Sequence, residues 1–273
     1  MLKNKRNMTM KEKRPSLFFD IDGTLVSFKT HAIPHSTVEA LTQAKRNGAR
    51  IYISTGRPLN IINNLGAIEH LIDGYITVNG AYIVVDSQTV SCHPISPEDV
   101  AWLLADAHTN DYACIISGEH DMVVYNPKDI VREVFIDQLA VTRLDFDTPP
   151  EQILHTQRIL QLSPFFSEQY EQSVLKALPH CVSGRWHPAF TDITSRQADK
   201  GKGLVRLAEH EQIDLADTIA FGDGGNDLSI IRTAGTGIAM GNAIPSLKEQ
   251  ADYVTTSVDD DGISLALQHF GII

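Results

Sequence analysis

Cysteine is scarce in this chain of 273 residues, which has only Cys92, Cys114 and Cys181. Their number is odd and no two of them stand in a Cys-x-x-Cys spacing, so the sequence offers neither a disulfide framework nor a zinc knuckle. We therefore expect a protein of a reducing compartment, the cytoplasm.

Basic residues and long apolar runs are also in short supply. Lys and Arg number 23 against 34 Asp and Glu, a formal net charge of −11. Nucleic-acid surfaces need clustered Lys and Arg, so we expect no nucleic acid as partner, whereas a bound divalent cation still admits a small phosphorylated metabolite. No run approaches the roughly 18 apolar residues that cross a bilayer, so no membrane partner is expected either. A monomer or a weak homo-oligomer is compatible with this composition.

The basic residues that are present concentrate in the first 14 positions, where the single acid is Glu12. This prefix lacks the apolar stretch and the small-residue cleavage site of a secretory signal. It is expected to be a flexible, solvated tail.

Strand and helix patterns alternate in the first and last eighty residues. The expected strands are 17–20, 51–53, 75–78, 218–221, 237–240 and 253–255, and the expected helices are 37–47, one between 58 and 74, 201–212, 226–233, 245–250 and 263–270. This alternation predicts an α/β fold, a Rossmann-like, doubly wound parallel sheet covered by helices.

The middle of the chain follows another order, because several strands are neighbours without a helix between them. The expected helices are 97–108, 129–139 and 167–178, and the expected strands are 112–116, 122–125, 158–162, 181–186 and 190–194. Such neighbours pair antiparallel, which indicates an inserted α+β domain. We predict a core of residues 1–83 and 190–273 and an insert of residues 84–189.

Two carboxylates close the first expected strand. Asp20 and Asp22 follow the apolar run Leu17-Phe18-Phe19, and side chains two apart on a strand point the same way. Two close carboxylates need a cation or a shared proton. The arrangement suits a metal-assisted reaction in which one carboxylate attacks and the other moves protons, with a plain turn or surface pair as the alternative.

Three further features stand at the carboxyl ends of expected strands or at the start of a helix, where ligands bind in parallel sheets. The hydroxyl and backbone amides of Thr55-Gly56-Arg57 suit a phosphate oxygen, although a strand-to-helix turn explains Thr-Gly nearly as well. In Gly222–Asp227 the glycines allow a tight turn and three side chains offer the oxygen ligands that magnesium prefers, with a plain turn as the alternative. Lys200 opens a helix and can balance a carboxylate cluster, unless it is simply solvated.

Taken together, these motifs resemble the haloacid dehalogenase (HAD) superfamily of phosphotransferases, and its Cof-type branch, subclass IIB, in particular. Their order along the chain is Asp-x-Asp-Gly-Thr, Thr-Gly-Arg, Lys-Gly and Gly-Asp-Gly-x-Asn-Asp. Val78-Asn79-Gly80-Ala81 and the segment 260–264 extend the likeness. The resemblance implies a magnesium-dependent phosphatase that works through an aspartyl-phosphate.

The resemblance also implies residue roles. Asp20 is the expected nucleophile and Asp22 the general acid and base, while Thr55 holds the phosphoryl group and Lys200 orients Asp20 and offsets negative charge. The implied magnesium ligands are Asp20, the backbone carbonyl of Asp22 and Asp223, with Asn226 and Asp227 supporting the metal or binding it directly.

By the same resemblance, the insert is a cap that excludes water and selects the leaving group. The candidate substrate contacts, each of which is alternatively an ordinary loop residue, are Thr55, Gly56, Arg57, Asn79, Gly80, Arg185, His187 and Lys200. Trp186 is expected in the core of the insert rather than as a platform for a sugar ring.

These observations predict a phosphatase of small phosphorylated metabolites, with hexose or pentose phosphates as the favoured substrates. Pyridoxal phosphate and nucleotides remain open as other esters. Two rivals also remain: a sugar phosphomutase with the same nucleophile, and a catalytically silent sensor of a phosphorylated ligand.

Overall fold

The computed structural model describes residues 14–139, 141 and 144–273. The chain forms two compact units, one built from the residues up to 55, 64–90 and 199–273, the other from 56–63 and 91–198. All of the basic prefix except Arg14 lies outside the described residues. Within the described part of the chain, no helix is long and apolar enough to cross a membrane.

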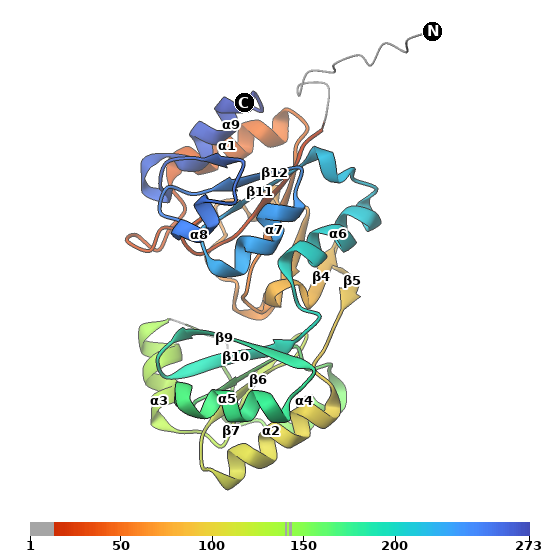
Figure 1. Cartoon of the computed structure of the whole chain (residues 1–273), viewed down its shortest axis with the longest axis vertical. Helices are drawn as coiled ribbons and strands as arrows, with labels where there is room; N and C mark the ends of the chain where they lie inside the picture. Colours follow the sequence, from red (N-terminus) through yellow and green to blue (C-terminus); the bar gives the residue numbers. More distant parts are fainter. Residues whose placement is uncertain (1–13, 140, 142–143) are drawn as a thin grey trace. The chain divides into compact units, whose positions relative to one another are not determined.

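An eight-stranded sheet forms the middle of the first unit, in the order β13-β12-β11-β1-β2-β3-β4-β5 (Figure 1). Its strands are β1 Ser16–Phe19, β2 Arg50–Ser54, β3 Gly74–Thr77, β4 Tyr82–Val85, β5 Gln88–Cys92, β11 Thr218–Gly222, β12 Thr236–Ala239 and β13 Tyr253–Val254. The pairs from β13 to β3 are parallel, and β4 returns antiparallel to β3.

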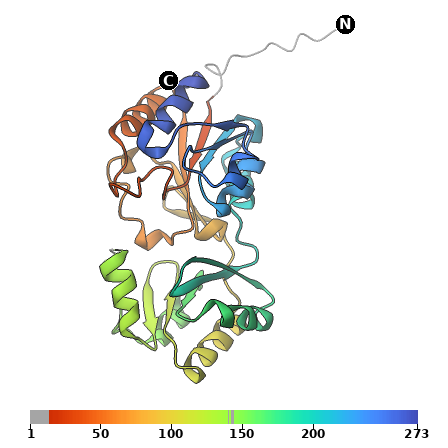
Figure 2. The ribbon, with the colours of Figure 1, turned by 60° about the vertical axis from the view of Figure 1, so that its left-hand side comes forward.

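Helices cover both faces of this sheet (Figure 2). They are α1 His35–Arg46, α6 Lys200–Glu211, α7 Leu228–Thr233, α8 Pro245–Lys248 and α9 Gly262–His269. On one face Phe18 and Tyr52 pack with Leu204 of α6 and Ile230 of α7. Helices α1 and α9 pack against each other elsewhere on the unit. The predicted Rossmann-like core is thus confirmed.

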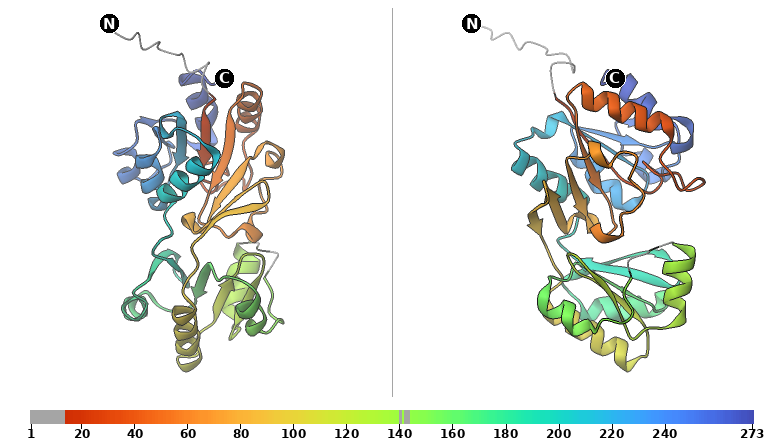
Figure 3. Two further views of the ribbon diagram at one scale, coloured as in Figure 1. Left: turned by 90° about the vertical axis from the view of Figure 1, so that its right-hand side faces the viewer. Right: turned by 180° about the vertical axis from the view of Figure 1, so that it is seen from behind.

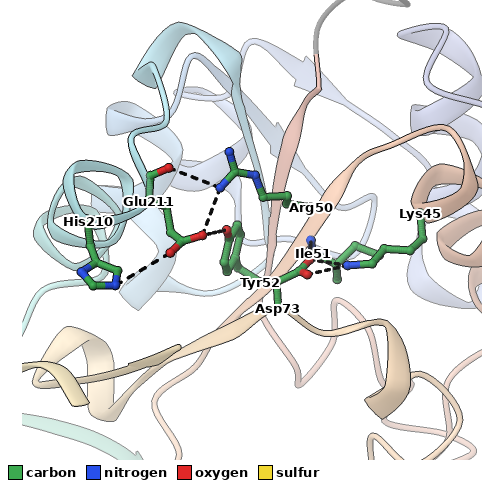
Figure 4. Close-up of polar contacts among 7 residues, drawn as sticks. All are labelled: Lys45, Arg50, Ile51, Tyr52, Asp73, His210 and Glu211. Carbon is green, nitrogen blue, oxygen red and sulfur yellow. Dashed lines mark hydrogen bonds and ion pairs between the residues drawn. The ribbon is translucent and has the colours of Figure 1, made fainter. Parts of the chain in front are cut away.

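Hydrogen bonds and ion pairs connect α6 and α1 to the sheet near β2 (Figure 4). Glu211 at the end of α6 accepts hydrogen bonds from Arg50 Nη1 at 3.0 Å and from the hydroxyl of Tyr52 at 3.2 Å. Asp73 accepts from Lys45 Nζ of α1 at 2.6 Å and from the backbone N–H of Ile51 at 2.7 Å. Tyr52 is buried, and this burial raises the pKa of its phenol. These contacts lie at the amino-terminal part of β2, away from its carboxyl end.

The second unit contains an antiparallel sheet (Figure 3). It has five strands in the order β7-β6-β8-β10-β9. Its strands are β6 Cys114–Ser117, β7 Met122–Tyr125, β8 Gln161–Pro164, β9 Cys181–His187 and β10 Phe190–Ser195. Its helices are α2 Pro97–Thr109, α3 Asp129–Val131 continued by the π-helix Arg132–Gln138, α4 Pro150–Thr156 and α5 Glu168–Ala177.

Several element predictions are wrong in detail. No long helix forms between 58 and 74; instead the structure has two 3-10 turns, Leu59–Ile61 and Glu69–Leu71. Helix α4 was not expected, and the unit boundaries fall at 90/91 and 198/199 rather than at 83/84 and 189/190. Strand pairing explains these boundaries. Strand β4 pairs with β3 and so belongs to the first unit, while β10 pairs with β8 and β9 and so belongs to the second.

Candidate active site

The carboxyl ends of β1, β2, β11 and β12 gather polar residues at one edge of the large sheet. Asp20 follows β1, Thr55 follows β2, Asp223 follows β11, and Asn242 lies three residues beyond β12. Because these strands are parallel neighbours, their ends bring distant parts of the sequence to one place.

Lys200 lies between two carboxylates. Its Nζ donates to Asp20 Oδ1 and to Asp227 Oδ1, both at 2.6 Å, and its side chain is fully buried. Helix α6 starts at Lys200, and Asp199 caps it by accepting from the backbone N–H of Lys202 at 2.8 Å. A Cβ on Gly201 would stand 2.6 Å from the carbonyl oxygen of Ser229, so glycine permits this close approach of α6 to α7.

Asp227 has partners for both of its carboxylate oxygens. Oδ1 accepts from Lys200, and Oδ2 accepts from the backbone N–H groups of Asp223 and Gly224, each at 3.0 Å. Asp227 is almost fully buried at the end of the 3-10 turn Gly225–Asp227. Its carboxylate therefore fixes the shape of the glycine loop as well as the position of the lysine.

Asp223 is held from two sides. The hydroxyl of Thr24 donates to Oδ1 at 3.0 Å, and the amide nitrogen of Asn242 lies 3.4 Å from Oδ2 while donating to the carbonyl oxygen of Gly23 at 2.8 Å. Gly23 has φ of +82°, and a Cβ there would lie 2.3 Å from Asp223 Oδ2. Only glycine fits the turn at this position.

The charges shift the protonation of the site. Burial raises the pKa of Asp20 above its ordinary value, against the opposing pull of Lys200. Burial raises the pKa of Asp223 to about 6, with the Asp227 carboxylate adding to the effect. The two carboxylates hold the pKa of Lys200 above its ordinary value despite its burial. The cluster thus sets three carboxyl groups, those of Asp20, Asp223 and Asp227, beside the ammonium group of Lys200.

This carboxylate cluster suits a hard cation. One oxygen each of Asp20, Asp223 and Asp227 lie within 4.8 Å of one another. Carboxylate oxygens are the donors that Mg²⁺ and Ca²⁺ take. Since Asp227 already has partners on both oxygens, Asp20 and Asp223 are the better placed direct ligands, and Asp227 is the better placed support.

Asp22 reaches the site by a turn rather than along a strand. Strand β1 ends at Phe19, and the chain turns back so that the N–H of Gly23 donates to Val26 O at 2.9 Å. Asp22 is partly exposed, and its charge contributes to the raised pKa of Asp223. The structure therefore places Asp22 near Asp223, by a turn and not by the strand alternation from which its position was expected.

Thr55, Asn79 and Asn226 form a linked group. The N–H of Asn79 donates to Thr55 O at 3.0 Å, and Asn226 Nδ2 donates to Asn79 Oδ1 at 3.1 Å. Gly80 has φ of +93°, and a Cβ there would lie 2.2 Å from Asp199 O, so this glycine packs beneath the start of α6.

The other predicted substrate contacts belong to the second unit. Gly56 and Arg57 fall in its segment 56–63. Arg185 donates to Glu171 at 2.6 Å and to the carbonyl oxygens of Phe166, Pro188 and Phe190 at 3.1 Å, and these bonds give it a structural role.

Trp186 and His187, which follow Arg185, differ in their contacts and in their exposure. His187 stacks on Phe190, and its Nδ1 accepts from the N–H of Ala189. The expectation that Trp186 lies in the core is wrong: 59% of the residue is exposed. Its polar edge is anchored to Asp192, which leaves the ring at the surface.

Thr24 and Asn242 are site residues that the sequence reasoning did not single out. Asn242 lies in the segment Met240-Gly241-Asn242-Ala243, directly after β12. Asp223 was singled out because ligands bind beyond the carboxyl ends of parallel strands. The same rule applies to Asn242. Thr24 is the threonine of the Asp-x-Asp-Gly-Thr motif, but no role in the site was assigned to it.

A family model of haloacid dehalogenase-like hydrolases matches residues 17–267. The chain belongs to this family. Its resemblance to the Cof-type, subclass IIB branch of the HAD superfamily is confirmed, as is its assignment as a phosphatase, a hydrolase of phosphate esters.

Individual HAD relatives match over nearly the whole chain. The Bacillus subtilis (strain 168) protein YkrA is 32% identical over 264 residues, 94% of this chain and 98% of YkrA. The solved structure of the HAD subclass IIB sugar phosphatase BT4131 is 45% identical with a TM-score of 0.85, covering 95% of this chain and all of the other. BT1666, a HAD phosphatase from Bacteroides thetaiotaomicron, is 30% identical with the same TM-score, covering 100% and 99%.

Proposed function

We propose that this HAD phosphatase hydrolyses sugar phosphates in a Mg²⁺-dependent reaction through an aspartyl-phosphate on Asp20. The observation that carries the proposal is the buried Lys200, whose Nζ lies 2.6 Å from both Asp20 and Asp227 beside a third carboxylate, Asp223. Because Lys200 holds the Asp20 carboxylate in one orientation, Asp20 is positioned to attack a phosphoryl group. The sugar as leaving group is supported by the 45% identity to a sugar phosphatase.

Asp20, Asp223 and the backbone carbonyl of Asp22 are the proposed magnesium ligands, with Asn226 and Asp227 in support. The oxygen donors and their spacing fit such an ion, and the ammonium of Lys200 alone does not neutralise three carboxylates. The ion, when bound, supplies positive charge that lowers the repulsion between a phosphate dianion and a carboxylate nucleophile.

Asp20 attacks the phosphorus atom and releases the sugar alcohol. Lys200 holds Asp20 Oδ1, so Oδ2 is the oxygen proposed to form the new bond. Asp22, partly exposed in the turn after Asp20, donates a proton to the leaving alkoxide and then takes one from the water that hydrolyses the aspartyl-phosphate. The hydroxyl of Thr55, at the end of β2, binds a phosphoryl oxygen.

The second unit, which includes Gly56 and Arg57, is the proposed cap that selects the leaving group. The three cysteines are free, which fits the proposed cytoplasmic location. The substrate is a small metabolite in this proposal, not a nucleic acid.

Phosphate release from p-nitrophenyl phosphate, with and without Mg²⁺, tests the proposal. Asp20→Asn should lose turnover, and acid-quenched wild-type enzyme should retain a covalently bound, hydroxylamine-labile phosphate that the variant lacks. Full turnover by Asp20→Asn, or in excess chelator, would contradict the proposed nucleophile or the proposed metal respectively. Circular dichroism of the variant shows that its fold is kept.

A further inference from the structure

Ser54 is a buried serine at the carboxyl end of β2, one position before Thr55. Only 1% of the residue is exposed, and its Oγ has no hydrogen-bond partner among the described residues. Buried polar atoms without a partner cost folding free energy and are rare in native proteins, and a role in catalysis is one of the reasons for which they are kept.

Strand pairing places Ser54 beside Asp20. The parallel register of β1 and β2 pairs Phe19 with Ile53, so the residues that follow them, Asp20 and Ser54, lie side by side. The backbone N–H of Asp20 still donates to Phe221 O at 3.1 Å, so the chain remains part of the sheet at this position. Neighbouring strands of a sheet are about 4.8 Å apart, which brings the two side chains close together.

Asp20 and Ser54 also face the same side of the sheet. Phe18 and Tyr52 precede them by two residues and stack with their ring centroids 4.9 Å apart, in a hydrophobic core to which α6 contributes. Side chains two apart on a strand share a face, so Ser54 faces α6. Asp20 faces α6 as well, because its Oδ1 accepts from Lys200 in the first turn of that helix.

The first turn of α6 packs closely on the sheet at this place. A Cβ on Gly203 would stand 2.7 Å from Cγ2 of Ile76, the residue that pairs with Ser54 across β2 and β3. The Ser54 hydroxyl is therefore enclosed between the strands and the helix that carries Lys200. A partner for this hydroxyl has to come from inside the protein, and Asp20 is the polar neighbour that the strand register gives it.

The carboxylate of Asp20 can take a second hydrogen bond. Lys200 Nζ donates to its Oδ1 at 2.6 Å, and a carboxylate oxygen has two lone pairs that accept. A hydrogen bond from a hydroxyl to a carboxylate is charge-assisted and therefore among the stronger ones. Rotation of Ser54 between staggered χ1 positions moves the hydroxyl, so it can donate to Asp20 at one stage of turnover and remain unpaired at another.

We propose that Ser54 is a positioning residue for the second half of the reaction, and that its hydroxyl donates to Asp20 Oδ1 while the aspartyl-phosphate is hydrolysed. It rests on the proposed function, which supplies the aspartyl-phosphate. In this step water attacks phosphorus, the bond from phosphorus to Asp20 Oδ2 breaks, its electron pair returns to the carboxylate, and Asp22 takes a proton from the water. A donor to Oδ1 stabilises the negative charge that returns to Asp20.

The first half of the reaction does not gain from this hydrogen bond. There the Asp20 carboxylate gives up its negative charge as Oδ2 bonds to phosphorus, so a donor to Oδ1 stabilises the starting state rather than the product. Loss of the Ser54 hydroxyl should therefore slow the breakdown of the aspartyl-phosphate and not its formation. A role confined to packing would give no such difference between the two steps.

Rapid acid quench of a single turnover of p-nitrophenyl phosphate, with enzyme and Mg²⁺ in excess, follows both steps as protein-bound, hydroxylamine-labile phosphate. We expect Ser54→Ala to slow the decay of this phosphate about tenfold, the effect of one lost hydrogen bond to a charged group, and to change its formation by less than about twofold. Ser16→Ala is the matched control. Ser16 is also fully buried and its Oγ has no partner in the described part of the chain, but it lies at the other end of β1, opposite Arg50.

Thermal unfolding separates this role from a role in folding. Each variant removes a buried hydroxyl that is unpaired in the resting protein, so both Tm values should equal or exceed that of the wild type. Decay at the wild-type rate in Ser54→Ala overturns the inference, as does an equal slowing of formation and decay or an equal slowing in Ser16→Ala. A lower Tm for Ser54→Ala alone also contradicts it, because the hydroxyl would then stabilise the resting fold. A wild type that forms no hydroxylamine-labile phosphate refutes the proposed function itself.

Discussion

The ammonium nitrogen of Lys200 lies 2.6 Å from Asp20 Oδ1, and both groups are buried. The same nitrogen lies 2.6 Å from Asp227 Oδ1, so one cation neutralises part of a buried anionic cluster. Lys200→Met should lower the free energy of unfolding of the metal-free protein by about 3–5 kcal/mol, because it leaves buried carboxylates uncompensated. Urea denaturation measures this change.

Lys200→Met should also lower kcat by a factor of about 10² to 10³, the usual effect of removing one preorganised electrostatic group. Lys202→Met is the matched control, since Lys202 lies two residues on in α6 with an exposed side chain. The control should keep both stability and activity. Equal behaviour of the two variants would contradict the role given to Lys200.

Gly23→Ala tests how tightly the turn after Asp20 packs on Asp223. At φ of +82° alanine is strained by about 1–2 kcal/mol, and its Cβ would stand 2.3 Å from Asp223 Oδ2. Gly271→Ala separates the two effects, because Gly271 also has positive φ but nothing within 4 Å of the added Cβ. We expect the Gly23 variant alone to lose Mg²⁺ affinity, measured as the Mg²⁺ dependence of turnover. If both variants bind Mg²⁺ equally well, the close packing is not what positions Asp223.

Much of the site was predictable because strand ends can be recognised in a sequence. Asp20 and Asp223 each follow a short apolar run, and parallel pairing of β1 with β11 brings them together. Asn242 follows β12 in the same manner but was missed, since a lone asparagine carries no distinctive spacing. Asp22 was assigned to the site on a strand argument that is wrong, because β1 ends at Phe19.

The second unit was less predictable for physical reasons. Its strands are short, and paired strands such as β6 and β8 lie more than 40 residues apart in the sequence. The sequence therefore predicted that these strands exist but not which of them pair. The π-helix Arg132–Gln138 has no known signature in the sequence.

Asn242→Ala should weaken Mg²⁺ binding without abolishing catalysis. Asn242 donates to Gly23 O, lies 3.4 Å from Asp223 Oδ2, and accepts from the N–H of Val258 at 3.0 Å. Residues that orient metal ligands typically contribute 10- to 100-fold to affinity. We expect the Mg²⁺ concentration for half-maximal rate to rise about tenfold, with kcat at saturating Mg²⁺ nearly kept. Asn47→Ala, whose side chain donates to Ile272 O, is the control and should leave the Mg²⁺ dependence unchanged.

Mg²⁺ should stabilise the protein more strongly as the pH rises from 5 to 8. Burial raises the pKa of Asp223 to about 6 from 3.8 and raises the pKa of Asp20 as well, so the folded metal-free protein holds protons that the unfolded chain has released. The stability of the metal-free protein therefore falls as the pH rises through this window. Mg²⁺ competes with those protons, and its binding becomes more favourable once they are gone.

The difference in Tm between 5 mM Mg²⁺ and excess chelator, followed by differential scanning calorimetry across this range, measures the competition. Asp223→Asn removes one proton-binding group and a proposed ligand, so its Tm difference should be small at every pH. A Mg²⁺-induced shift that is large at pH 5 and constant up to pH 8 would show that the ion binds without displacing protons. In that case these carboxylates are not its ligands.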